Sequence, residues 1–472
     1  MNIMKKQTFN PYLPSYEYIP DGEPYVFDGR LYVYGSHDHF GGARYCGDDY
    51  VLWSADINDP SDWVCHGRIY HRDQDPMHHI NSNHLHAPDA TRGPDGRYYL
   101  YYPHIYYCAV AVSDTPYGPF EFHGRVHYKD GSIYGMGNKE KGIPAVSSDD
   151  PAILVDDDGR IWLYTGYVPS DPSFRAEIEK ACPRLWGALC VELEPDMITV
   201  KGEPRIIVPG RGYAEGTSFC GNEFFEASGI RKIGDTYYFV YSSYRSHDLC
   251  YATSKYPDRD FVYRGILVSC VDGGISEKPR SLFCNTHGNL VKIKDKWYIF
   301  YHRSSGSNFA RQGCAEEIEL LSDGSFRQAE ITSCGLNGAP LLAKGKYSAH
   351  IACNLFSGDG NHLPHFMQDG EDGTVCSQYI ADIRRNDCVG YKYFDFQSRP
   401  LTLTITYRGN ACGALEISAG DKKTALASIE VDSYGDWHSQ SVSISFPQGK
   451  QALIFRYLGE GSIDIESFSF DL

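Results

Sequence analysis

Residues 151–167 read PAILVDDDGRIWLYTGY: an apolar strand, a turn of Asp and Gly, and a second strand of aromatic and aliphatic residues. A turn of this composition between two runs of β-forming residues is typical of a β-hairpin. The turn and second strand recur as FDGRLYVYGSHD (27–38), PDGRYYLYYPH (94–104), IGDTYYFVYSS (233–243) and IKDKWYIFYHR (293–303). The chain therefore carries five copies of one hairpin signal.

The spacing of the copies predicts the architecture. They align on Tyr32, Tyr99, Trp162, Tyr238 and Tyr298, with spacings of 67, 63, 76 and 60 residues. Such a period is too long for one hairpin, and it fits a four-stranded blade with its loops. Residues 1–335 are therefore expected to form a five-bladed β-propeller whose site lies at the central axis. An ordinary β-sandwich with coincidental hairpins is the alternative.

The repeat stops near residue 335. Residues 336–360 are expected to be a linker, and residues 361–472 a separate β-sandwich of the jelly-roll kind. Segments such as LTLTITYRG (401–409) and SQSVSISFP (439–447) alternate between apolar and polar residues over the length of a sandwich strand. The predicted fold class is all-β, a five-bladed β-propeller followed by a β-sandwich.

Charge and composition narrow the class of partner. The chain has 44 Lys and Arg against 61 Asp and Glu, a net charge of −17, and no basic block. Nucleic acid and anionic membranes bind clustered positive charge, so neither is expected as a partner. A neutral ligand remains open. The 37 Tyr residues suit half-buried strands and also a sugar-binding surface, where ring faces and hydroxyl groups both find partners.

The N-terminal segment MNIMKKQTFNPYLPSYEY has no apolar stretch of the kind an export signal needs. No window approaches the length of a membrane-spanning helix. The 15 cysteines are scattered without a zinc-ligand spacing, so they are expected to be reduced thiols in a cytoplasmic protein. The sequence does not indicate an oligomeric state.

Three acidic residues each precede an apolar strand that leads into a repeat copy. They are Asp21 in YIPDGEPYVF, Asp150 in SSDDPAILV and Glu226 in NEFFEASGI. Equivalent positions in different blades point toward one axis, so the three carboxylates are expected to converge. Cleavage of a glycosidic bond needs two carboxyl groups in opposite protonation states. The two aspartates also fit ordinary turns, whereas a charged Glu226 inside a strand is harder to explain structurally.

With these motifs in this order, residues from about 8 to 335 resemble glycoside hydrolase family 43, the inverting β-xylosidases, α-L-arabinofuranosidases and arabinanases. The resemblance rests on Pro-Asp before a strand, on D-P-x4-D-D-D-G-x2-W-L, and on F-E-A-S-x3-K-x4-Y-Y. It implies that Asp21 is the general base, that Glu226 is the general acid, and that Asp150 orients this acid and tunes its pKa. An inverting pair stands roughly 6.5–9.5 Å apart, and this separation is expected between Asp21 and Glu226.

The resemblance extends to further residues of the axis. His287 in NTHG matches a central histidine that coordinates a calcium ion in many family members, with a hydrogen-bonded core histidine as the alternative. Arg311 resembles an arginine that reaches the sugar pocket and stabilises the carboxylates, with a surface arginine as the alternative. No organic cofactor is implied.

Other expected substrate contacts are His37 and Asp38, in the GSHD segment after the first blade strand, and His86. His86 stands in HLHAPDA, where the family commonly has Trp. Because of this departure, the sequence does not show which residue forms the aromatic platform near the cleaved sugar, or which sugar is bound.

Residues 361–472 resemble carbohydrate-binding module family 6 in CVGYKYFDF (388–396) and GDWHSQSVSISF (435–446). The resemblance implies two aromatic residues that clamp a sugar ring, for which Tyr391 and Trp437 are the candidates. The Asn that the family uses near the last strand is Ser462 here, so a purely structural role stays open.

The leading hypothesis is an inverting exo-acting glycosidase that releases xylose or L-arabinofuranose from oligosaccharides derived from plant polysaccharides. One alternative is a catalytically silent sugar-binding propeller, which predicts a lost acid or base. Another is an endo-acting enzyme of the arabinanase type, which needs an open groove rather than a pocket. Retaining propellers of the fructosidase type carry Arg-Asp-Pro and Glu-Cys, and this chain contains neither.

Overall fold

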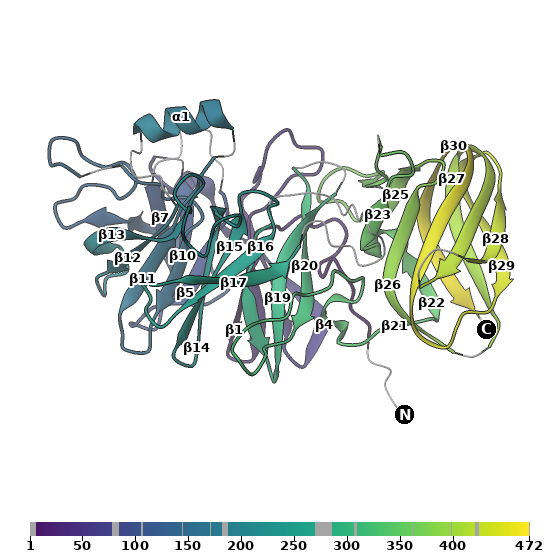
Figure 1. Ribbon diagram of the computed structural model, residues 1–472, viewed down its shortest axis with the longest axis horizontal. Coiled ribbons are helices and arrows are strands. Elements are labelled where there is room, and N and C mark those ends of the chain that lie inside the picture. Colours follow the sequence, from purple (N-terminus) through teal and green to yellow (C-terminus); the bar gives the residue numbers. More distant parts are fainter. Residues whose placement is uncertain are drawn as a thin grey trace.

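The chain folds into two β-rich units that lie side by side (Figure 1). The computed structural model describes residues 6–77, 85–104, 107–143, 145–169, 171–181, 187–269, 286–305, 309–360, 362–397, 399–420 and 424–471. One α-helix, α1 (Pro172–Ala181), lies on the outside of the first unit (Figure 1). No helix within these ranges is both long and apolar enough to cross a membrane.

Five sheets follow one another along the first unit, and each contains one repeat copy. Blade 1 holds β1 (Glu23–Phe27), β2 (Arg30–Tyr34), β3 (Tyr50–Asp56) and β4 (Asp59–Tyr70). Blade 2 holds β5 (Asp89–Arg92), β6 (Tyr98–His104), β7 (Tyr107–Ser113) and β8 (Glu121–Arg125). Blade 3 holds β10 (Ala152–Val155), β11 (Ile161–Thr165), β12 (Gly187–Leu193) and β13 (Thr199–Pro209), with β9 (His127–Tyr128) added at its edge. Blade 4 holds β14 (Phe224–Ile233), β15 (Thr236–Ser243), β16 (Leu249–Ser254) and β17 (Val262–Val268). The described strands of blade 5 are β18 (Leu290–Ile293), β19 (Lys296–Ser304) and β20 (Arg311–Ile318). The five-bladed propeller predicted from the repeat is confirmed.

The turn of the first copy shows why each copy folds as a hairpin. Phe27 pairs with Arg30, which leaves Asp28 and Gly29 as a two-residue connection. Both have positive φ, 48° and 79°. Tight hairpin turns of this kind match the twist of the flanking strands and favour Asp or Asn followed by Gly.

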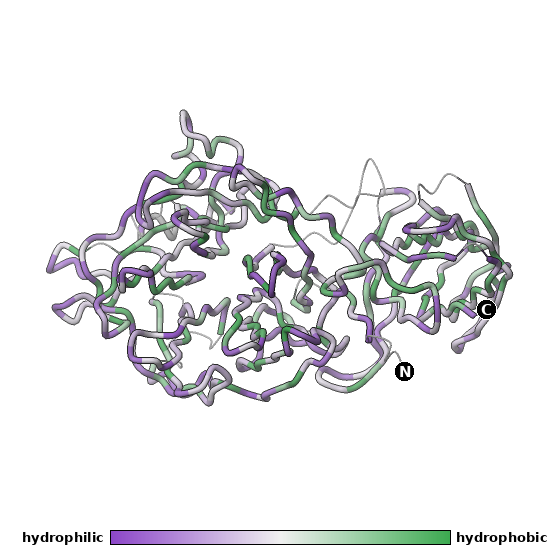
Figure 2. The backbone as a smooth tube through the Cα atoms, turned by 90° about the horizontal axis from the view of Figure 1, so that it is seen from below, coloured by the Kyte–Doolittle hydropathy of each residue, from purple (hydrophilic) through white to green (hydrophobic). Residues whose placement is uncertain are grey.

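The propeller core lies between the blades rather than in one central mass. Each of five apolar clusters draws its residues from two neighbouring blades, and the cluster around Leu31 and Phe300 joins the last blade to the first. A backbone bridge between Gly22 and Gly288 also closes the ring. The largest fully buried side chains are all tyrosines, so many of them fill the spaces between blades. Figure 2 shows apolar segments along the strands and polar segments in the turns that protrude furthest.

The second unit is a sandwich built on two very long strands, β27 (Leu401–Ala419) and β30 (Gly449–Asp471), which pair along their whole length. Its other strands are β21 (Leu341–Leu342), β22 (Gly345–Ser348), β23 (Asn354–Phe356), β24 (His365–Gln368), β25 (Gln378–Ile383), β26 (Cys388–Phe396), β28 (Ala425–Val431) and β29 (Tyr434–Ile444). One large apolar cluster fills the space between them.

The segment 336–360, expected as a linker, belongs to this second unit. Its strands β21, β22 and β23 pair with β26 and β30. The side chains of Leu341, Tyr347 and Leu355 are buried in the core of the sandwich. The end of the repeat therefore marks the start of the second unit rather than a linker, because burial of these apolar side chains stabilises the segment in the sandwich.

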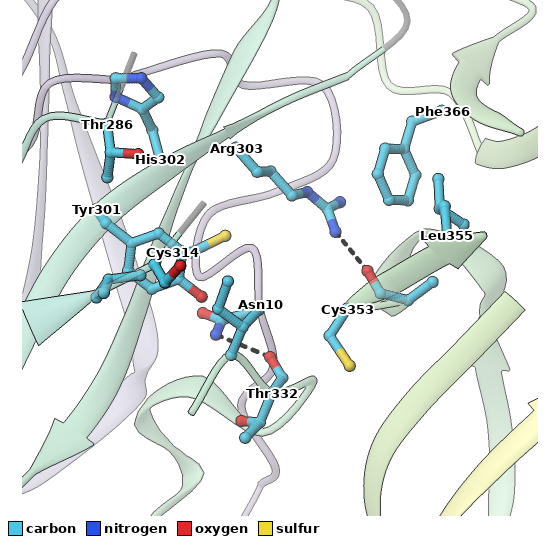
Figure 3. Close-up of a pocket in the computed structure, with 14 residues that line it drawn as sticks. Asn10, Thr286, Tyr301, His302, Arg303, Cys314, Thr332, Cys353, Leu355 and Phe366 are labelled. Carbon is cyan, nitrogen blue, oxygen red and sulfur yellow. Dashed lines mark hydrogen bonds between the residues drawn. The ribbon is translucent and has the colours of Figure 1, made fainter. Parts of the chain in front are cut away.

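The two units meet through blade 5. The Arg303 guanidinium donates to the carbonyl groups of Ala352 and His350, each at 2.8 Å, and lies 3.8 Å from the ring centre of Phe366. Figure 3 shows Arg303 and Phe366 beside a cavity of about 40 Å³. This cavity has room for a few water molecules and is too small for a sugar.

Candidate active site

Asp21 is buried at the propeller axis just before β1, with φ of 57°. Ser36 donates its hydroxyl to Oδ2 at 2.6 Å, and Arg311 donates to Oδ1 at 2.9 Å. The backbone N–H of Asp21 donates to Nδ1 of His302, which holds the residue in place. Burial alone would raise the pKa of Asp21, but Arg311, His302, His287 and Ser36 together hold it well below its usual value. Asp21 is therefore ionised at neutral pH and can accept a proton.

Asp38 fixes the arginine that acts on Asp21. Its carboxylate accepts from the backbone N–H of Arg311 at 3.0 Å, from Nε at 2.8 Å and from Nη2 at 3.0 Å. It also accepts from the backbone of Cys46. Three of these bonds hold Arg311 so that Nη1 points to Asp21. Arg311 therefore stabilises the carboxylate, as the resemblance implied.

The prediction that Asp38 contacts substrate is wrong. Its exposed fraction is 0%, and both of its oxygens are occupied by Arg311 and Cys46. Arg311 itself is only 2% exposed, with its Nε and both terminal nitrogens directed at Asp38 and Asp21, so a direct bond to a sugar hydroxyl is not supported.

Asp150 lies on the opposite side of the axis, directly before β10. It has φ of 44°, and its Oδ2 accepts the backbone N–H of Ala227 at 2.7 Å. Ala227 follows Glu226 at an irregularity in β14, where its own φ is 66°. Burial, followed by the charge of Glu226 and then of Asp21, raises the pKa of Asp150 well above its usual value. Asp150 thus holds the backbone beside Glu226 and shares its electrostatic environment.

His287 stands between the two aspartates. Its Nδ1 lies 3.9 Å from Oδ1 of Asp21 and 3.9 Å from Oδ2 of Asp150. Burial lowers the pKa of His287 to about 4. The charge of Asp21 opposes this shift, and the charge of Arg311 adds to it. The imidazole is therefore neutral at neutral pH. The structure brings Asp21 of blade 1 and Asp150 of blade 3 to one side chain. Glu226 of blade 4 acts electrostatically on Asp150, and the roles assigned to the three acids stay predictions.

A second polar layer below His287 was not predicted from the sequence. Oε2 of Glu23 accepts from Arg231 at 3.0 Å and from Asn289 at 2.9 Å. Burial, followed by the charge of Asp89, raises the pKa of Glu23 to about 8. The position of Glu23, an acid two residues after Asp21 at the start of an apolar strand, was the signal that could have identified it.

The axis also offers a place for a cation. Oε1 of Glu23 and Nε2 of His287 are both buried, lie 3.8 Å apart, and have no hydrogen-bond partner among the described residues. Calcium takes oxygen ligands, so Glu23 would bind the ion that the resemblance implied directly and His287 would bind it through a coordinated water molecule.

Aromatic side chains flank the carboxylates, and the sequence did not single them out. The ring of Tyr45 lies over the Arg311 guanidinium at 4.8 Å and contacts Phe309 edge-on. On the other side, Tyr167 packs against Phe225 with ring centres 5.6 Å apart. Burial and then the charge of Glu226 raise the pKa of Tyr167.

Two expected substrate contacts stay predictions. His37 is half-buried, and its Nδ1 lies 3.1 Å from the carbonyl of Asp49. His86 is also half-buried, and its backbone carbonyl accepts the Tyr50 hydroxyl.

The aromatic clamp expected in the second unit is not formed. Tyr391 is fully buried and packs on Phe468 and Phe455, so its assignment to sugar binding is wrong. Its position in β26 turns the side chain into the sandwich core. Trp437 is half-buried, with the Arg408 guanidinium 4.2 Å from its ring centre.

A propeller axis with an ionised carboxylate and, close by, two neighbouring carboxyl groups is typical of a glycoside hydrolase. Comparison with known proteins agrees. Residues 58–326 match the family of glycosyl hydrolases family 43, and the chain belongs to this family and is a glycosidase.

The chain is 46% identical to a xylosidase/arabinosidase of Thermoclostridium stercorarium, over 99% of both chains. Among solved structures, it resembles a family 43 β-xylosidase/α-arabinofuranosidase from a compost microbial metagenome, in complex with xylotriose and in a calcium-free form. That match has 27% identity and a TM-score of 0.52, and covers 66% of this chain and 94% of the other. A family 43 arabinoxylan arabinofuranohydrolase from Bacillus subtilis, in complex with cellotetraose, shares the fold over 98% of this chain and 97% of its own, with 20% identity and a TM-score of 0.51.

Proposed function

We propose that this glycosidase releases xylose or L-arabinofuranose from short oligosaccharides of plant-polysaccharide origin, with inversion at the anomeric carbon. The observation that carries the proposal is that Asp21, bonded to Arg311, and Asp150, bonded to the backbone beside Glu226, both lie 3.9 Å from Nδ1 of His287, with pKa values shifted in opposite directions. Inversion requires an ionised base on one side of the sugar and a protonated acid on the other. The choice of pentose is supported by the relatives, one named a xylosidase/arabinosidase and another bound to xylotriose.

In this reaction Asp21 takes a proton from a water molecule as the water oxygen attacks the anomeric carbon. Glu226 gives its proton to the oxygen of the leaving sugar as the glycosidic bond breaks. Asp150 holds the backbone beside Glu226 through the Ala227 N–H and, as a buried neighbour, keeps a proton on the pair. Afterwards Asp21 returns its proton to solvent and Glu226 takes one up, so the site regains its starting state.

The test is Glu226→Ala, assayed against nitrophenyl xyloside and nitrophenyl arabinofuranoside. We expect loss of most hydrolysis, by about 10²–10⁴-fold, with an unchanged circular dichroism spectrum. Unchanged turnover in the folded variant would remove Glu226 from the mechanism. Chromatography of the products from a xylo- or arabino-oligosaccharide then separates the modes of action, because exo action yields monosaccharide from the start and endo action yields shorter oligosaccharides.

For the axial cation we propose calcium, held by Glu23 and His287. When bound, it would supply positive charge below Asp21 and Asp150 and so favour the ionised base. The support is the pair of unpartnered buried atoms on Glu23 and His287, together with the solved relative described as a calcium-free form. We expect calcium to raise the melting temperature of chelator-treated protein, and Glu23→Gln to reduce that rise. An identical rise in both proteins would place calcium elsewhere.

A further inference from the structure

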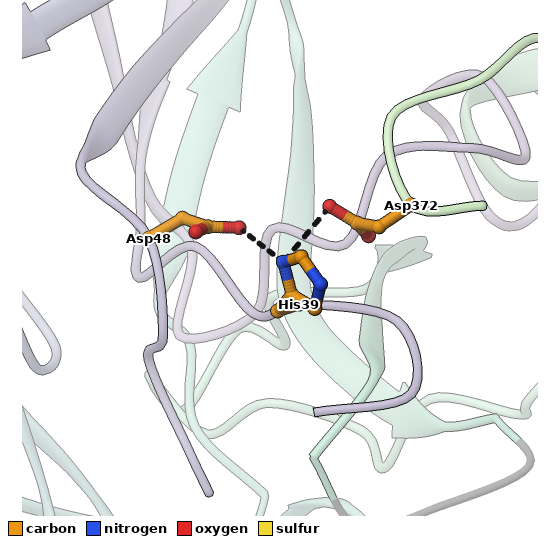
Figure 4. Close-up of side chains that lie close together, drawn as sticks. All are labelled: His39, Asp48 and Asp372. Atoms are coloured by element: carbon orange, nitrogen blue, oxygen red, sulfur yellow. Dashed lines mark hydrogen bonds and ion pairs between the residues drawn. The ribbon is translucent and has the colours of Figure 1, made fainter. Parts of the chain in front are cut away.

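A second group of metal-binding side chains lies away from the axis, where a loop of blade 1 meets the C-terminal unit. Nδ1 of His39 lies 3.1 Å from Oδ2 of Asp48 and 3.2 Å from Oδ2 of Asp372 (Figure 4). The three atoms all lie within 4.8 Å of one another. His39 and Asp48 belong to the loop between β2 and β3, and Asp372 lies between β24 and β25.

We propose that His39, Asp48 and Asp372 bind one divalent transition-metal ion, Zn²⁺ in the first place, that joins the two units. A tetrahedral zinc site with bonds of about 2.0–2.1 Å places neighbouring ligand atoms about 3.3 Å apart. The two observed nitrogen–oxygen separations, 3.1 and 3.2 Å, match this length. An imidazole nitrogen with two carboxylate oxygens suits zinc, whereas calcium takes six to eight oxygen ligands.

The charge of the group favours a metal ion over a simple ion pair. One imidazole N–H cannot satisfy two carboxylate oxygens equally well. Among the described ion pairs, neither Asp48 nor Asp372 has an Arg or Lys partner. A divalent cation would balance both carboxylates at once. The side chains of His39 and Asp48 are 49% and 35% exposed, so a water molecule can complete the coordination.

The surroundings hold the three ligands in position. Oδ1 of Asp372 accepts the backbone N–H of Phe40 at 2.7 Å, which leaves Oδ2 directed at His39. The ring of Phe40 stacks on Tyr18, with ring centres 5.5 Å apart. The backbone of Gly42 donates to the carbonyl of His39 at 2.9 Å and fixes the turn of the loop. Partners of this kind orient ligands and raise metal affinity.

An adjacent histidine provides a matched control. Nδ1 of His71 also lies 3.1 Å from a carboxylate oxygen, that of Asp49, and its side chain is 47% exposed. Here, however, the single carboxylate already pairs with Arg68 and Arg72. His71 therefore has nearly the same exposure and the same type of contact as His39, without a second carboxylate and with excess positive charge.

The experiment uses the full-length chain after chelator treatment and dialysis. Zn²⁺ is titrated by isothermal calorimetry and its effect is followed by thermal melting, with Ca²⁺ in parallel. We expect saturable zinc binding and a rise in melting temperature with Zn²⁺. The part of this rise that depends on His39 and Asp372 should not appear with Ca²⁺ at equal concentration. His39→Ala and Asp372→Asn should each weaken that site at least tenfold or remove one equivalent of zinc, while His71→Ala binds as the wild type does.

Two results would overturn the proposal. One is the absence of saturable zinc binding by the wild-type protein. The other is equal zinc binding by the wild type, His39→Ala and Asp372→Asn, each verified as folded by circular dichroism. Because all three ligands are outside the axis, hydrolysis of nitrophenyl pentosides by these variants reports separately on the proposed catalytic function.

Discussion

Asp21 and Asp150 both have a carboxylate oxygen 3.9 Å from the same atom, Nδ1 of His287, and yet their pKa values shift in opposite directions. Both are buried, so desolvation alone would raise both pKa values. Asp21 faces the guanidinium of Arg311, whereas Asp150 faces the carboxyl group of Glu226. Because both carboxyl groups are buried, the charge of the nearest neighbour accounts for the difference between their pKa values.

The largest loss of activity is expected when the ionised carboxylate of the two, that of Asp21, is removed. Asp21→Asn keeps the shape of the side chain but cannot accept a proton, so water loses its base. We expect kcat to fall by about 10²–10⁴-fold with little change in KM. Steady-state kinetics with a nitrophenyl pentoside measures this loss. Azide is an anionic nucleophile that needs no base, so adding azide should restore part of the turnover of Asp21→Asn. If azide restores no turnover, the role of Asp21 as the base is contradicted.

Asp150→Asn tests the other side of the contrast. If Asp150 lends negative charge to the acid, its loss lowers the pKa of Glu226, and the basic limb of the pH–rate profile moves to lower pH. We expect a kcat about 10–100-fold lower together with this shift. A basic limb at the wild-type position would mean that Asp150 acts only through its bond to the Ala227 N–H.

Asp38→Asn sharpens the contrast without touching either acid. The variant keeps a side chain of similar size but loses the negative charge that holds Arg311 in position. Arg311 then stabilises ionised Asp21 less well. The pKa of Asp21 then rises. Because the base must be ionised, the acidic limb of kcat/KM moves to higher pH, and the loss of kcat/KM is largest on the acidic side of neutral pH. A loss of activity with an unmoved acidic limb would indicate a merely structural role for Asp38.

The smallest effect is expected far from the axis. Trp437→Ala removes a half-buried ring of the C-terminal unit, so both limbs of the pH profile should stay where they are. Turnover of a small nitrophenyl pentoside should stay within about twofold of the wild type. Binding to insoluble arabinoxylan, measured by sedimentation, should weaken if this unit holds polysaccharide. Unchanged sedimentation would favour a structural role for the unit.

Much of the fold was predictable because hairpin signals are local. Turn residues such as Asp28 and Gly29, and the alternation of the strands that follow, are visible within about ten residues. Burial was harder to predict. Asp38 looked like a pocket residue from its place after a blade strand, and Tyr391 looked like a sugar platform. Both are enclosed by partners distant in sequence, Arg311 and Phe468.

The sequence by itself determined the number of blades and the order of the hairpins, because each depends on short segments and their spacing, and it predicted which three acids carry the reaction. Only the tertiary structure decided which acid is ionised and which carboxylates meet at His39. Asp21 and Arg311 are 290 residues apart in the chain, yet they lie 2.9 Å apart in the fold. Electrostatic energies fall with distance in space and are independent of separation along the chain, so proton affinities emerge only after folding.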